Sequence, residues 1–348
     1  MVIVDSSIAT FLATDGIVNG AVYALMAIAI VLIFSVTRIL FIAQGEFVVF
    51  GAASLYQLQN GVLPSAAWLL AVAALLATSQ TIWVGWRQGH HARAVALEAL
   101  RTLAIPASVL AVTIALRGQK MPTVVAILLT LAIITPLGPL LHRLVYRSLS
   151  TSSVLTLLIV SVGVHFAMTS LALALLGPEG FRIAPFAETG VNLGLVSLTG
   201  QAIVILLASA LLIAILSFAF TSSFQGMALR ATAVNQLGAR IVGLSADRAG
   251  QVSFALAAAL GALSGMLIAP TVTIFYDTGF LIGLKGFVAA VFAGLASFPG
   301  ALVGALVVGL IESYASFLAS AFKDAIVFAA VLPILLWRSL VHGSSEEH

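Results

Sequence analysis

Long apolar runs, repeated along almost the whole chain, most constrain what this sequence can fold into. A membrane-spanning α-helix needs about 20 consecutive apolar residues, because the hydrocarbon core of a bilayer is about 30 Å thick. Runs of about this length occupy residues 12–34, 40–58, 66–86, 100–116, 121–141, 154–176, 201–220, 251–270, 284–298, 300–319 and 322–338. In lipid, a helix satisfies its own backbone polar groups. We therefore predict an all-α, polytopic transmembrane helix bundle of about nine to eleven spans, forming one domain over residues 1–348.

Composition narrows the function classes. The chain is 61% hydrophobic and 8% charged, whereas a soluble protein carries about a quarter charged residues. It has no cysteine, which excludes disulfides, thiolate metal sites and cysteine nucleophiles. No phosphate-binding G-x-x-x-x-G-K-[ST] motif is present, so we expect neither ATP bound by this chain nor an enzyme. The basic patches are too short for nucleic-acid binding.

Basic residues orient the predicted spans, because they are enriched in cytoplasmic loops. Arg38 follows the first run, the basic stretch Arg87–Arg93 follows the third, and Arg143 follows the fifth. These positions predict an N-terminus outside the membrane and a C-terminus in the cytoplasm. Arg117 and Lys120 disagree with this topology, since they fall in an outside loop.

Residues 221–250 are more polar than the runs on either side and are predicted to form a short helix outside the bilayer. One face of that helix would be apolar and the other small or neutral. The apolar face holds Val234, Leu237, Ile241 and Leu244, and the other face holds Thr232, Asn235, Ala239 and Gly243. From the pattern alone, this is either a solvated connecting helix or a docking surface. Small residues such as Ala239 and Gly243 would let another protein approach closely.

A resemblance favours the docking surface. Gly226–Asn235 reads GMALRATAVN and resembles the cytoplasmic coupling loop of ABC importer permeases, most of all the branched-chain amino acid permease family. The first span with Asn19 and Tyr23, and the following FIAQGE motif at Phe41–Glu46, resemble the same family. So do the RLVYR segment at 143–147 and the glycine-rich residues 285–309.

The resemblance implies a membrane-spanning permease subunit in the bacterial inner membrane that translocates branched-chain or related amino acids. Implied partners are the lipid bilayer, cytoplasmic ATPases that bind ATP-Mg and hydrolyse it, a second related permease and an external solute-binding protein. The implied ATPase contacts are Gly226, Arg230, Ala231, Asn235, Ala239 and Gly243. A urea or short-amide permease stays open as an alternative, as do a stand-alone secondary transporter and a non-transporting scaffold.

One segment departs from the family pattern. The family usually has one span between the second span and the basic R-x-x-Y-R segment, whereas three are expected here. Residues 63–118 are therefore predicted to be an inserted helical hairpin, peripheral to the transport path. An even number of added spans leaves the downstream topology unchanged.

Polar residues inside the runs are the candidates for a translocation path, namely Asn19, Tyr23, Gln44, Glu46, His165 and Glu312. An ionised carboxylate in lipid costs about 2.5 kcal/mol or more, so Glu46 is predicted to face the bundle interior, or to lie near the cytoplasmic edge with Arg38 as a partner. Gln44 stands where the family usually has histidine. His165 is more typical of a satisfied bundle histidine than of a ligand, and no metal site is expected around it. Glu312 and Tyr314 are candidates for an outer vestibule.

Overall fold

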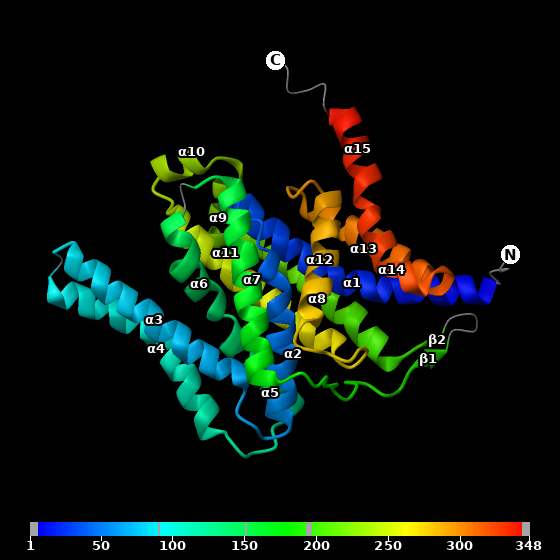
Figure 1. The fold of residues 1–348 in the computed structure, drawn as a ribbon, viewed down its shortest axis with the longest axis horizontal. Coiled ribbons are helices and arrows are strands. Elements are labelled where there is room, and N and C mark those ends of the chain that lie inside the picture. The colour runs from blue at the N-terminus through cyan, green and yellow to red at the C-terminus, as the bar shows by residue number, and fades with distance from the viewer. Residues whose placement is uncertain (1–5, 90, 150–151, 193–196, 343–348) are drawn as a thin grey trace.

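The computed structural model describes residues 6–89, 91–149, 152–192 and 197–342, and these are almost entirely helical (Figure 1). Within them, eight helical stretches are long and apolar enough to cross a membrane. The elements of these stretches are α1 (Ser6–Thr37), α3 (Ser65–Arg87), α4 (Ala92–Ala115), α5 (Thr123–Ile134) with α6 (Leu137–Leu141), α7 (Val154–Leu176), α8 (Gly200–Ser222), α11 (Ala246–Ile268) and α13 (Phe298–Leu318). The predicted class, an all-α polytopic bundle, is confirmed.

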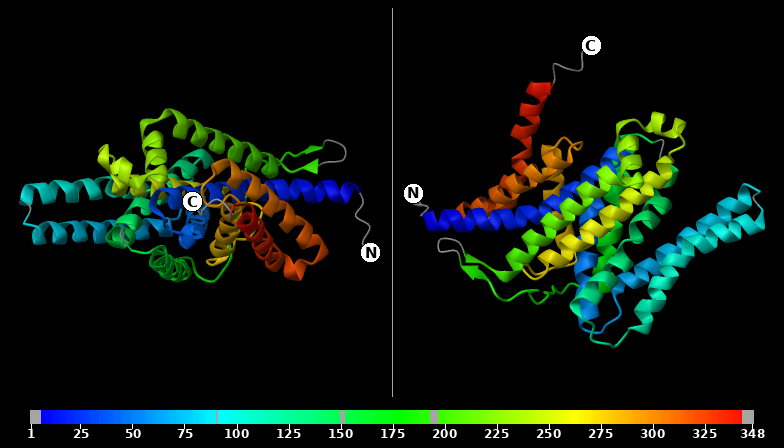
Figure 2. Two further views of the ribbon diagram at one scale, coloured as in Figure 1. Left: turned by 90° about the horizontal axis from the view of Figure 1, so that it is seen from above. Right: turned by 180° about the vertical axis from the view of Figure 1, so that it is seen from behind.

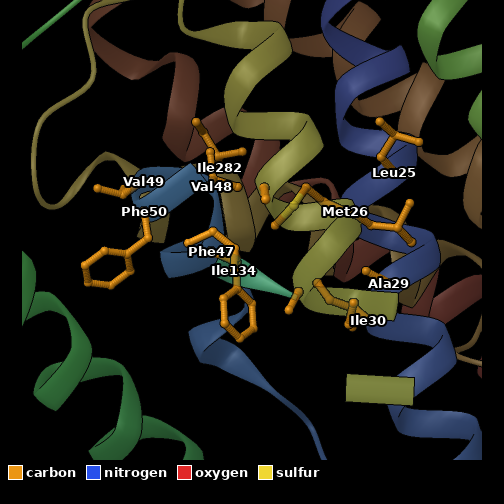
Figure 3. Packing of buried hydrophobic residues seen from close by; sticks show 14 of the residues in the cluster. Leu25, Met26, Ala29, Ile30, Phe47, Val48, Val49, Phe50, Ile134 and Ile282 are labelled. Carbon is orange, nitrogen blue, oxygen red and sulfur yellow. The ribbon is translucent and has the colours of Figure 1, made fainter. Parts of the chain in front are cut away.

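Helices α1 and α11 form the centre of the bundle. In the most apolar window of each helix, 83% of α1 and 67% of α11 is buried inside the protein, against 17% for α4 and for α8. The outer helices therefore keep most of their apolar surface for lipid. Figure 3 shows part of this core, with Met26 and Ile30 of α1 on one side of a central helix and Phe47 and Ile282 from two other helices on the other side; all four belong to one buried apolar cluster.

Two short helices, α2 (Glu46–Gln59) and α12 (Thr278–Phe292), pack beside this centre. Helix α2 lies on α11, and α12 lies on α1. Each is shorter than the roughly 20 residues that a full span needs. The 3₁₀ turn η1 (Ile42–Gly45) precedes α2, so the predicted second span at 40–58 is only partly α-helical. The predicted span at 284–298 begins earlier, at Thr278, and Lys285 lies inside the resulting helix α12.

The stretch after α5 is locally irregular. Pro136 and Pro139 lack the N–H that a regular helix needs, and the chain passes from α6 through a π-helical turn, η2 (His142–Tyr146), to a 3₁₀ turn, η3 (Arg147–Leu149). These turns bring the basic residues of the RLVYR segment to one end of the bundle.

Helices α3 and α4 form an antiparallel hairpin that projects away from the other helices (cyan in Figures 1 and 2). Val95 packs directly against Gly85, where a side chain would not fit. At the tip, Trp83 and Trp86 are exposed, and the guanidinium of Arg87 lies 4.1 Å from the ring centre of Trp83. The segment predicted as 63–118 is thus helical. That it is an insertion relative to the family stays a prediction.

The remaining elements lie at the ends of the bundle. Strands β1 (Val191–Asn192) and β2 (Ser197–Leu198) pair antiparallel between α7 and α8. Helices α9 (Phe224–Val234) and α10 (Gln236–Ile241) connect α8 to α11. The last predicted span, at 322–338, is interrupted at Ala330 and consists of α14 (Lys323–Ala329) and α15 (Val331–His342).

Candidate functional site

The first polar site lies where η1 enters α2, in very close contact with α12. A Cβ atom added at Gly45 would overlap the Gly279 carbonyl, and one added at Gly279 would overlap the Gly45 carbonyl. Glycine at both positions therefore lets two backbones touch, which in membrane bundles favours tight helix association. This contact holds the beginning of α2 against the beginning of α12.

Glu46 and His165 form a buried pair at this point. Oε1 of Glu46 lies 2.8 Å from Nδ1 of His165 on α7, and Glu46 is fully buried. The ring of Phe280 on α12 stacks on His165, with centroids 4.7 Å apart. Three elements, α2, α7 and α12, therefore meet at one carboxylate–imidazole pair. His165 is a partnered bundle residue, as its position in a span predicts.

Arg38 is not the partner of Glu46, which corrects one expectation from the sequence. Its guanidinium instead lies over the ring of Phe34, 5.8 Å from the centroid, and its backbone adopts φ 60° just after α1 ends. Glu46 points into the bundle, toward α7. The carboxylate thus takes its partner from a helix 119 residues away in sequence.

Gln44 and Glu46 retain hydrogen-bonding capacity. Nε2 of Gln44 donates to the carbonyl of Ala257 on α11 at 2.8 Å. Oε1 of Gln44 and Oε2 of Glu46 have no hydrogen-bond partner among the described residues, although both side chains are fully buried. Buried acceptors without a partner are costly, so these two oxygens are the atoms at this site best placed to take a water molecule or another donor.

A second polar site lies between α1, α12, α13 and α14. The hydroxyl of Tyr23 donates to Oε2 of Glu312 at 2.6 Å, and Nζ of Lys285 donates to Oε1 of Glu312 at 2.5 Å. Nζ of Lys285 also lies 3.0 Å from Oδ1 of Asp324, off the direction of a good hydrogen bond. The side chains of Lys285 and Glu312 are 7% and 9% exposed. One lysine thus joins two carboxylates inside the bundle.

Polar contacts continue from this site along α1. Asn19 donates to Oδ2 of Asp15 at 3.3 Å, and Ser313 donates to the same oxygen at 3.1 Å. Tyr314 donates to the backbone carbonyl of Ala9 at 3.1 Å. Glu312 and Tyr314, considered above for an outer vestibule, therefore fasten α13 to α1.

The six candidate path residues fall into two groups. Gln44, Glu46 and His165 share the first site, while Asn19, Tyr23 and Glu312 belong to the second. Lys285 and Asp324 were not among the predicted site residues. Lys285 could have been identified from the sequence, because it is a charged residue within an apolar, glycine-rich stretch. Such a charge must face the bundle interior.

The segment 221–250 differs from the single helix predicted for it. Helix α9 ends at Val234. The backbone of the next residue, Asn235, leaves the helical region, and its side-chain oxygen accepts from the N–H of Gly238 at 2.8 Å. Thr232 is 1% exposed and Ala239 is 5% exposed, so these small residues face this chain rather than a partner. The large apolar side chains that are exposed here are Phe224, Met227, Val234, Ile241 and Val242.

The other residues expected to touch an ATPase are distributed around this segment. Gly226 is buried where α9 crosses the end of α8, and a Cβ there would overlap the Ala219 carbonyl. Arg230, Ala231 and Asn235 are exposed. Gly243 is exposed too, with φ 87° and open space around its Cα.

A small apolar cluster connects this segment to the transmembrane core. Leu229 of α9 and Phe220 of α8 pack with Leu32 and Val36 at the end of α1. Phe220 also stacks on Phe298 at the beginning of α13, with centroids 5.1 Å apart. Leu229 thus packs α9 against α1, and Phe220 packs the end of α8 against α13.

Comparison with known proteins identifies the family. The family model described as "Branched-chain amino acid transport system / permease component" matches residues 95–336. The permease protein LivH of Salmonella typhimurium is 29% identical over 208 residues, which cover 56% of this chain and 66% of the relative. LivH of Escherichia coli K12 is 34% identical over 146 residues, covering 40% and 46%, and BraD of Pseudomonas aeruginosa is 28% identical over 213 residues, covering 58% and 68%.

The matched part of this chain thus spans slightly less than two thirds of the Salmonella relative and about half of the Escherichia coli relative. No solved structure matches it significantly. The family match covers well over half of the chain and includes the α9–α10 segment and three residues of the second polar site, Lys285, Glu312 and Asp324. The chain therefore belongs to the family of permease components of branched-chain amino acid transport systems.

Proposed function

We propose that this protein is the membrane-spanning permease subunit of an ABC importer that carries branched-chain amino acids across the inner membrane. The observation that carries the proposal is the family match over residues 95–336. The names of the LivH and BraD relatives support the substrate class. In this proposal the chain binds no ATP itself, and ATP-Mg is hydrolysed by cytoplasmic partner subunits.

The ATPase docks on the exposed α9–α10 surface in this proposal. Val234, Ile241 and Val242 are 87%, 79% and 74% exposed, and they lie beyond the ends of α8 and α11. Apolar side chains exposed together outside the lipid-facing helices are typical of a protein-docking surface. The arginines near this surface, such as Arg230 and Arg248, support a cytoplasmic location for it by the positive-inside rule. The N-terminus then lies outside and the C-terminus inside.

The proposed power stroke passes through the apolar cluster beneath α9. Movement of the ATPase shifts α9, and Leu229 and Phe220 transmit that shift to α1 and α13. Transport also needs the second permease and the external binding protein, which does most of the substrate selection.

A docking experiment tests this assignment. A cytoplasmic ATPase subunit of the same transport system should co-purify with the full-length protein. Val234→Asp with Ile241→Asp should reduce that capture at least tenfold and abolish ATP-driven uptake. Thr221→Asp with Ser222→Asp is the matched control, because it adds the same charge at exposed positions near the same end. Equal capture of the ATPase by both variants would contradict docking on this surface.

Uptake by reconstituted liposomes distinguishes the substrates and the alternative mechanism. ATP-dependent uptake of leucine, isoleucine or valine with the complete assembly supports the proposal. Uptake restricted to urea or short amides would place the chain in the alternative substrate class. Uptake by this chain alone, driven by an ion gradient, would overturn ABC coupling. The Glu46–His165 pair is the reason to measure uptake driven by an ion gradient, since a buried carboxylate and imidazole can exchange a proton.

A further inference from the structure

A basic cavity lies between the α3–α4 hairpin and the rest of the bundle, away from both polar sites. Its volume is about 730 Å³, and α4, the α6–η2 segment and the beginning of α11 form its walls. Its charged lining consists of Glu98, Arg101, Arg143, Arg147, Asp247 and Arg248. We call it the basic cavity.

The ion pairs of this cavity leave two positive charges unmatched. Arg143 pairs with Glu98 at 3.1 Å, and Arg147 pairs with Asp247 at 3.6 Å. Arg143 is further held by a 2.8 Å hydrogen bond to Thr102 on α4, so it fastens the hairpin to the bundle. Both acids are thereby engaged. The cavity consequently has an excess of two arginines over carboxylates.

Arg101 and Arg248 are the two arginines without a partner. Both side chains are exposed, line the same cavity, and make no ion pair or side-chain hydrogen bond within the described part of the chain. Arg248 lies in the first turn of α11, a 23-residue helix whose N-terminal dipole also favours an anion. Two free guanidinium groups beside a helix N-terminus suit a phosphate, which arginine binds with paired hydrogen bonds.

The uncharged lining is partly apolar. Its apolar members are Ile105, Pro106, Pro136, Pro139, Leu140 and Ala255, beside the polar residues Thr102, Thr135, Ser245 and Gln251. Ile105 is 63% exposed, and the exposed face of α4 continues outward with other apolar side chains. A free phosphate would leave this wall uncovered. A molecule with an anionic head and a hydrocarbon body would cover it.

Side chains typical of a membrane interface occur on the same hairpin. Trp83 and Trp86, with Arg87 stacked on Trp83, occupy the neighbouring end of α3. Exposed tryptophan beside arginine marks a membrane interface, and basic pockets at the cytoplasmic interface take anionic lipid heads.

We propose that the basic cavity binds one anionic phospholipid, with its phosphate held by Arg101 and Arg248 and its chains along the apolar wall of α4. The lipid joins the hairpin to the beginning of α11, which directly follows the α9–α10 surface. This site is independent of the transport assignment and of both polar sites.

Native mass spectrometry of the purified full-length protein tests the proposal. After exchange into phosphatidylcholine micelles, the protein is titrated with phosphatidylglycerol. One tightly retained phosphatidylglycerol is expected, with at least tenfold preference over added phosphatidylcholine. Arg101→Gln with Arg248→Gln should weaken retention about 30-fold, since each basic residue near an anionic lipid contributes roughly a factor of five. Arg101→Lys with Arg248→Lys should keep most of the binding.

The matched control is Arg87→Gln with Arg93→Gln, which removes the same charge from exposed positions at the hairpin tip, outside the cavity. It should retain the lipid as the wild type does. An equal loss of bound phosphatidylglycerol in this control would show that the lipid is attracted by surface charge in general, and would overturn the proposed site. Unchanged binding by the Gln variant of the cavity, or equal retention of phosphatidylcholine, would overturn it as well. Displacement of the lipid by inorganic phosphate at similar concentration would show that the cavity binds free anions, and would refute its assignment as a lipid site.

Discussion

Replacing Lys285 with methionine is the sharpest test of the second polar site. Lys285 is 7% exposed and lies between Glu312 and Asp324, which are 9% and 35% exposed at their side chains. Methionine keeps the length and apolar stem of lysine but removes the charge. Glu312 is then left buried with the hydroxyl of Tyr23 as its remaining hydrogen-bond donor among the described residues.

The expected loss of unfolding free energy depends on which buried charges have no partner after the substitution. Removing one partner of a buried ion pair costs about 3–5 kcal/mol. Glu312 carries most of this cost, because water reaches the more exposed Asp324 and lowers its share. We therefore expect Lys285→Met to reduce the free energy of unfolding by about 3–5 kcal/mol. Adding Glu312→Gln removes the stranded charge while keeping an acceptor for Tyr23, and should restore at least half of the loss.

Reversible unfolding by SDS in mixed micelles, followed by loss of helical circular dichroism, measures these free energies. Lys120→Met is the control, because Lys120 is exposed and such surface changes usually stay within about 0.5 kcal/mol. A loss below about 1 kcal/mol for Lys285→Met, or no recovery with Glu312→Gln, would refute the argument that a buried charge is left unpaired.

Three further predictions concern the first site and the hairpin. Glu46→Gln should lower the maximal rates of uptake and of coupled ATP hydrolysis together, by about 5- to 150-fold, with an unchanged substrate profile; a changed profile at full turnover would make Glu46 a recognition residue. Gly279→Leu should strongly reduce the yield of folded protein, because its side chain would collide with the Gly45 backbone, whereas Gly163→Leu, which has open space, should fold normally. A tag inserted at Gly89 should be reached only from the cytoplasm, and labelling from outside intact cells would reverse the topology.

The positions of the long helices can be predicted from the sequence. A continuous apolar helix is stable in lipid even when it makes few specific side-chain contacts. The short helices do not follow as well. Helix α2 begins only at Glu46, after a 3₁₀ turn, and α12 includes Lys285. A hydropathy pattern predicts ordinary spans for these stretches, because hydropathy contains no information on which backbones touch. The contact between the Gly45 and Gly279 backbones is visible only in the structure.

The partners of the site residues required the three-dimensional structure. The sequence predicts that Glu46 faces the bundle interior, from the cost of a charge in lipid, yet nearness along the chain suggested Arg38. The actual partner, His165, comes from another helix. Two residues of the predicted docking face, Thr232 and Ala239, are buried, whereas Asn235 and Gly243 are exposed. A helical projection assumes one continuous helix, and the break at Asn235 changes the direction of the side chains after it, including Ala239.

Helix α12 connects the two polar sites mechanically. Phe280, near its beginning, stacks on His165, and Lys285, more than one turn later, binds Glu312. Between and beside them, Gly279 and Gly283 lie against the backbone of Gly45. Helix α12 has 15 residues and contacts both polar sites. Helix α13 follows α12 and touches Phe220 beneath the α9–α10 surface. In the proposed mechanism, movement at that surface would reach both sites through this chain of packed side chains, which is one route by which distant sites are coupled.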